Sequence, residues 1–75
     1  SEKDSLFETI IVATNDELVN QFLNKKINFL DISSKMIKIL SLNEFKKYKH
    51  IKANTLDKIV KLNSYVRFKI NNLGI

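Results

Sequence analysis

The fold is decided by residues 13–40, which read ATNDELVNQFLNKKINFLDISSKMIKIL. Apolar residues recur in this stretch every three or four positions, which is the period of an amphipathic helix. The first such series is Leu18, Val19, Phe22 and Leu23, and the second is Ile32, Met36, Ile39 and Leu40. A hinge at residues 27–31 separates them. The stretch therefore predicts two short helices, each of which buries one apolar face.

Residues that commonly cap the N-terminus of a helix support this assignment. Thr14 or Asn15 can cap the first helix, and Thr14 with Glu17 has the spacing of a capping box. Adjacent carboxylates at Asp16 and Glu17 then lie in the first turn, where the helix dipole favours anions. Since helix neighbours point about 100° apart, these two carboxylates do not form an acid–base pair. Asp31 is the expected cap of the second helix.

A third, longer helix is expected near the C-terminus, with Asn54 or Thr55 as its cap. Its apolar stripe is predicted to comprise Leu56, Ile59, Val60, Val66 and Ile70. The connector over residues 41–53 has a weaker helical pattern and could supply a fourth helix, as could a segment upstream of this chain. The predicted fold class is all-α, a small bundle of three to four helices.

The N-terminal residues have a different pattern. Residues 1–12 are predicted to form a tail and a short extended lead, and residues 13–75 the helical bundle domain. The run Leu6–Val12 is rich in β-branched residues, which suit extended backbone. A helical interaction adaptor that docks through this apolar lead is one alternative function.

The amino-acid composition excludes several common kinds of functional site. The 75 residues include no Cys, no Pro, one Gly and one His. One glycine cannot build a phosphate-binding loop, and one histidine without cysteine excludes the usual zinc sites. No apolar run approaches the roughly 18 residues of a membrane span, so no membrane partner is expected. We assign no catalytic, cofactor-binding or metal-binding residue, although the chain could still be part of an enzyme.

The net charge of +5 is concentrated in the C-terminal half. One interpretation is a small basic module that binds nucleic acid through lysine–phosphate contacts and aromatic stacking. Its candidate contacts are Lys46, Lys47, Tyr48 and Lys49. The alternative is a solvated connector that rests on the bundle through Phe45, Tyr48 and Ile51. We favour the connector, because nucleic-acid recognition usually recruits Arg and the only Arg is Arg67.

One family resemblance is specific. The segments ATND (residues 13–16), FLNKKI (22–27) and FLDI (29–32) resemble the start of the C-terminal helical domain of 1-deoxy-D-xylulose 5-phosphate reductoisomerase. That family has Ala-Ala-Asn-Glu, a Phe-Leu pair, a Lys-Ile step and an aromatic-x-Asp-Ile hinge at this spacing. Thr14 and Asp16 stand where the family has Ala and Glu. The segment TLDKIV (55–60) is similar to the family's last helix.

The resemblance implies a parent enzyme that rearranges and reduces 1-deoxy-D-xylulose 5-phosphate to 2-C-methyl-D-erythritol 4-phosphate. It implies NADPH and a divalent cation as cofactors, in the non-mevalonate pathway of isoprenoid biosynthesis. Both would bind the domains that precede this one, whose motifs this chain lacks. The implied role is structural packing against those domains, in the cytoplasm or a plastid-like organelle.

Overall fold

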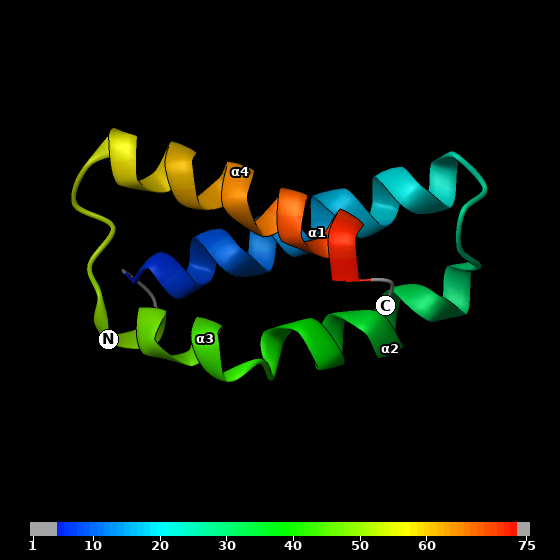
Figure 1. The fold of residues 1–75 in the computed structure, drawn as a ribbon, viewed down its shortest axis with the longest axis horizontal. Coiled ribbons are helices and arrows are strands. Elements are labelled where there is room, and N and C mark those ends of the chain that lie inside the picture. Colours follow the sequence, from blue (N-terminus) through cyan, green and yellow to red (C-terminus); the bar gives the residue numbers. More distant parts are fainter. Residues whose placement is uncertain (1–4, 74–75) are drawn as a thin grey trace.

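A computed structural model describes residues 5–73 of the chain. The elements in chain order are α1 (Leu6–Leu23), α2 (Phe29–Leu40), α3 (Asn43–Lys46), the 3₁₀ helix η2 (Lys47–His50) and α4 (Leu56–Leu73). No element within residues 5–73 is a strand, which confirms the all-α prediction and the three main helices. The connector supplies the short fourth helix, α3. Helix α1 runs between α4 on one side and α2 with α3 on the other (Figure 1).

The extended lead predicted at the N-terminus is wrong over residues 6–12, which form the first turns of α1. The boundary expected between residues 12 and 13 therefore falls inside a helix. Ser5 caps this helix, since its hydroxyl accepts a hydrogen bond from the Phe7 amide at 3.2 Å. The side chains of Leu6, Phe7 and Ile10 are buried. Burial of one helical face has overridden the β-propensity of the run. The tail was predicted over residues 1–5, and this is wrong for Ser5, which is buried and caps α1; residues 1–4 lie outside the described residues.

Of the predicted helix caps, one is confirmed and two are wrong. Thr14 does not cap a helix, because it lies buried in the middle of α1. Helix α2 begins earlier than expected: Asp31 is in its first turn and accepts a hydrogen bond from the Asn28 amide at 2.9 Å. The predicted cap of α4 is confirmed, as the Thr55 hydroxyl accepts from the Lys58 amide at 3.2 Å.

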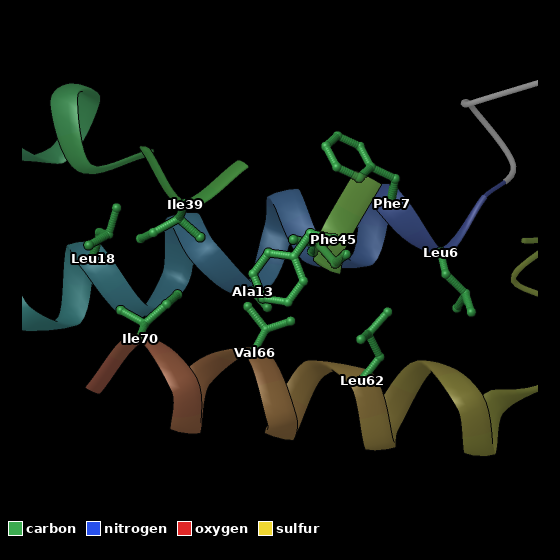
Figure 2. Packing of buried hydrophobic residues seen from close by; sticks show 10 residues of the cluster. Leu6, Phe7, Ala13, Leu18, Ile39, Phe45, Leu62, Val66 and Ile70 are labelled. Atoms are coloured by element: carbon green, nitrogen blue, oxygen red, sulfur yellow. The ribbon is translucent and has the colours of Figure 1, made fainter. Parts of the chain in front are cut away.

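One hydrophobic core joins the helices. The 3₁₀ helix η2 contributes no fully buried residue, but its Tyr48 packs against this core. The buried members of the core are Leu6, Phe7, Ile10, Ala13, Leu18, Ile39, Phe45, Leu62, Val66 and Ile70 (Figure 2). Met36 and Ile59, both expected inside, are partly buried and pack against this cluster. Phe22 was also expected there. It is only half-buried, and its ring instead meets that of Phe29 edge to face, with centroids 5.8 Å apart.

The buried stripe of α4 is rotated relative to its predicted position. Leu62, Val66 and Ile70 face the core, whereas Leu56 is 76% exposed and Val60 is 53% exposed. All five positions fit a helical period, so sequence spacing alone could not separate the two adjacent faces. The orientation was decided by which residues meet α1.

The Thr14 hydroxyl is the one buried side-chain polar atom within residues 5–73 that has no hydrogen-bond partner. Desolvating an unpaired hydroxyl costs about 1–3 kcal/mol. We expect Thr14→Val, which keeps the shape and removes the hydroxyl, to raise the free energy of unfolding by about 1 kcal/mol. Urea denaturation of both chains measures this, with Thr9→Val, a half-buried threonine on the same helix, as the control. A loss of stability in Thr14→Val would show that the hydroxyl is satisfied.

Candidate functional site

The candidate nucleic-acid contacts lie together at one end of the bundle, on α3 and η2. Lys46 and Lys47 are exposed, while Tyr48 and Lys49 are half-buried. Tyr48 packs against the core, as the connector interpretation predicts. The Lys47 ammonium lies 5.3 Å from the Tyr48 ring centroid, and that of Lys49 lies 4.9 Å from the centroid of Phe7. Tyr48 and Lys49 thus both make contacts with other side chains of this domain.

These contacts lead to a test of the nucleic-acid alternative. We expect the chain to bind single-stranded DNA only through its net charge, so that replacing Lys46, Lys47 and Lys49 by alanine weakens binding no more than removing any three exposed lysines. Lys25, Lys26 and Lys38 provide that matched control set, because all three are exposed. Fluorescence anisotropy over a salt series measures both variants. A selective loss at the connector lysines would support nucleic-acid recognition there.

The adaptor alternative loses most of its proposed surface. Leu6, Phe7 and Ile10 of the predicted lead are buried in the core. Ile11 and Val12 remain 39% and 53% exposed. Any partner of this segment would therefore meet a helix face rather than a free extended strand.

A partly buried ion pair links α1 to α4. The Arg67 Nε donates to the Glu17 Oε1 at 3.1 Å, and the Glu17 side chain is only 7% exposed. The Arg67 side chain is 39% exposed and reaches solvent. The carboxylate needs this partner, because an unpaired buried charge is costly. Glu17 therefore links α1 to α4 through its ion pair with Arg67.

A second polar link joins α3 to α4. Glu44 accepts a hydrogen bond from the Lys69 ammonium at 2.9 Å, and the Tyr65 hydroxyl lies 3.4 Å from the same carboxylate. The bond to Glu44 raises the pKa of Lys69 above its ordinary value of 10.5. The link fixes the short connector helix against α4.

This link has a predictable pH dependence. A raised pKa in the folded state means that the stabilisation is complete below pH 10.5 and is lost as the pH rises through the raised value. We expect a small stability difference between the unmodified chain and Lys69→Met, since the pair is solvent-accessible. That difference should be constant from pH 7 to 10 and shrink above it, as followed by thermal unfolding. A difference that does not shrink as the pH rises above 10.5 would contradict the assignment.

A hollow of about 480 Å³ lies between the N-terminal halves of α1 and α4. Val12, Ala53, Ile59 and Val60 give it an apolar lining, and Glu8, Thr9 and Asn63 add polar groups. A further hollow of about 410 Å³ lies along α1, lined by residues that include Val19, Leu23 and Arg67. Sequence reasoning missed both, because each is lined by residues that lie far apart in the sequence.

Within residues 5–73, no three His, Asp or Glu side chains come together in a way that could hold a metal ion. None of the helices over the same range is both long and apolar enough to cross a membrane.

Comparison with known proteins identifies the family. The family model described as the DXP reductoisomerase C-terminal domain matches residues 1–69. The 1-deoxy-D-xylulose 5-phosphate reductoisomerase of Pelagibacter ubique is 52% identical over 75 residues, which are 100% of this chain and 19% of that protein. The chain thus spans about a fifth of that relative's length. No solved structure matches it. This chain belongs to the DXP reductoisomerase C-terminal domain family.

Proposed function

We propose that this chain is the non-catalytic C-terminal domain of a 1-deoxy-D-xylulose 5-phosphate reductoisomerase and that it braces the rest of that enzyme. The match of a C-terminal-domain family model to residues 1–69 carries the proposal. The parent would convert 1-deoxy-D-xylulose 5-phosphate to 2-C-methyl-D-erythritol 4-phosphate in isoprenoid biosynthesis. NADPH and a divalent cation would bind its preceding domains, and the parent would work in the cytoplasm or a plastid-like organelle.

The parent's activity is tested on the full-length protein. We expect oxidation of NADPH that depends on both 1-deoxy-D-xylulose 5-phosphate and a divalent cation, followed by absorbance. A full-length protein that folds yet consumes no NADPH with this substrate would overturn the proposed activity.

The non-catalytic role of this domain needs a separate test. His50 and Asp57 are exposed titratable groups of different chemistry. We expect His50→Gln and Asp57→Asn to leave kcat and KM of the full-length enzyme unchanged, because neither would touch the reacting atoms. A fall of kcat by tenfold or more in either folded variant would place catalytic chemistry in this domain.

A further inference from the structure

A third hollow, of about 440 Å³, lies where the start of α1, η2 and the N-terminal half of α4 meet. Leu6 of α1 and Leu62 of α4 line its base, and their buried side chains point toward each other (Figure 2). Tyr48 of η2 and Tyr65 of α4 add aromatic walls. Small-molecule sites in proteins are typically hollows of about 300–1,000 Å³ with mostly apolar walls and a few polar groups. This hollow has both the volume and the composition of such a site.

The charged groups around this hollow are mainly cationic. Lys58 and Lys61 line it, together with Asp57. Asp57 lies 3.2 Å from the Lys61 ammonium, but both side chains are more than 70% exposed. Water therefore screens this ion pair, and an incoming anion can replace it at little cost. The Lys47 ammonium, 5.3 Å from the centroid of the Tyr48 ring, adds a further cation beside the hollow.

The excess of cations extends over this end of the bundle. Residues 46–61 contain six Lys and one Asp, which give a formal charge of +5, equal to the net charge of the whole chain. The Glu44 carboxylate also lies near the hollow, 3.4 Å from the Tyr65 hydroxyl, but the Lys69 ammonium pairs with it at 2.9 Å and offsets its charge. A local excess of one sign of charge raises the concentration of oppositely charged ligands. Anions are therefore drawn to the end of the bundle that carries the hollow.

We infer that this hollow binds a small amphipathic anion, namely an organic carboxylate or phosphate with an aliphatic or aromatic body. The apolar body would lie against Leu6, Leu62 and Tyr65, and the anionic group would accept hydrogen bonds from the ammonium groups of Lys58 and Lys61. The charge of the rim selects an anion, and the apolar base favours an organic one. The site would be present whatever reaction the parent catalyses, because it is built from residues of this chain alone.

The other two hollows do not combine these features. Glu8 is the one charged group that lines the hollow between α1 and α4, and its carboxylate would repel an anion. The hollow along α1 includes Arg67, but Asp16 lines it too and Arg67 already pairs with Glu17. Among these three hollows of residues 5–73, the one at η2 is thus alone in having more cationic than acidic groups in its lining.

Photoaffinity labelling of the full-length protein tests this site. The probe is a medium-chain fatty acid that carries a diazirine, and the alcohol with the same chain is the neutral control probe. Cross-linked peptides are mapped and quantified by mass spectrometry. One double variant, Lys58→Gln with Lys61→Gln, removes the cations of the hollow. The matched control, Lys26→Gln with Lys38→Gln, removes the same charge from exposed lysines that line none of the three hollows.

We expect the acid to label the peptides that contain Tyr48 and Tyr65, and the alcohol to label them at least about fivefold less. The Lys58 and Lys61 double variant should lose labelling by the acid at least about fivefold, and the control double variant less than about twofold. Excess octanoate and excess octyl phosphate are added as competitors. The stronger competitor identifies whether the anionic group is a carboxylate or a phosphate.

Four results would overturn the inference. Equal losses in the two double variants would show that net charge alone attracts the probe. Equal labelling by the acid and the alcohol would show that the hollow binds apolar chains without recognising an anion. Labelling confined to other peptides would place the binding elsewhere. Labelling that neither octanoate nor octyl phosphate reduces would show that the probe reacts without occupying a site.

Discussion

Phe45→Ala is expected to destabilise the domain by about 3–5 kcal/mol, because it leaves a cavity at the centre of the core. Phe45 is fully buried and reaches the shared core from the short helix α3 (Figure 2). A domain of this size buries only about 60% of its unfolded surface and has little stability to lose. The midpoint of thermal unfolding should therefore fall by more than about 10 °C. Circular dichroism at the helix bands measures this.

The control for Phe45 is a phenylalanine that the structure leaves in solvent. Phe68 on α4 is 66% exposed, so Phe68→Ala should change the free energy of unfolding by less than about 0.5 kcal/mol. Equal effects of the two substitutions would contradict the packing described for Phe45. They would also indicate that α3 does not hold its place against α1 and α4.

Arg67→Met is expected to cost about 2–3 kcal/mol, because it leaves the Glu17 carboxylate buried without a partner. We place the loss below the range for fully buried pairs, since Arg67 is 39% exposed and water can approach from its side. The methionine retains the apolar stem of the arginine, so lost packing contributes little. Urea denaturation at pH 7 measures the change.

A double variant distinguishes the loss of the charge partner from the loss of side-chain packing. Glu17→Leu with Arg67→Met removes both charges and should recover most of the stability lost by Arg67→Met alone. Lys61→Met is the exposed control: Lys61 lies 3.2 Å from Asp57, but both side chains are more than 70% exposed. Its effect should stay below about 0.5 kcal/mol. A double variant as unstable as the single one would show that Glu17 does not depend on Arg67.

Much of the fold follows from residue order. The scarcity of helix breakers and the periodic stripe of α2 predict helices there, and Ile32, Met36, Ile39 and Leu40 do face or flank the core. Thr55 caps α4 as its position suggests. These features depend on neighbours along the chain, which the sequence displays directly. The resemblance carried by residues 13–32 agrees with the family match over residues 1–69.

The missed features depend on contacts between distant residues. The β-branched run at residues 6–12 is helical because Leu6, Phe7 and Ile10 can be buried against Phe45 and the apolar face of α4. That gain exceeds a local preference for extended backbone, which spans only about 1 kcal/mol. The pairing of Glu17 with Arg67, fifty positions apart, could not be inferred from either residue's neighbours.

The sequence by itself determined that this protein is an all-α domain, where its last helix begins, and the family to which it belongs. Helical period and capping are local properties, and a family signature is read from residue identities. Only the tertiary structure decided which side of each helix is buried, why Leu56 and Val60 remain exposed, and where the hollow between α1 and α4 lies. The physical reason is that burial depends on the angles at which helices meet, and those angles are set by all the side chains of the core together.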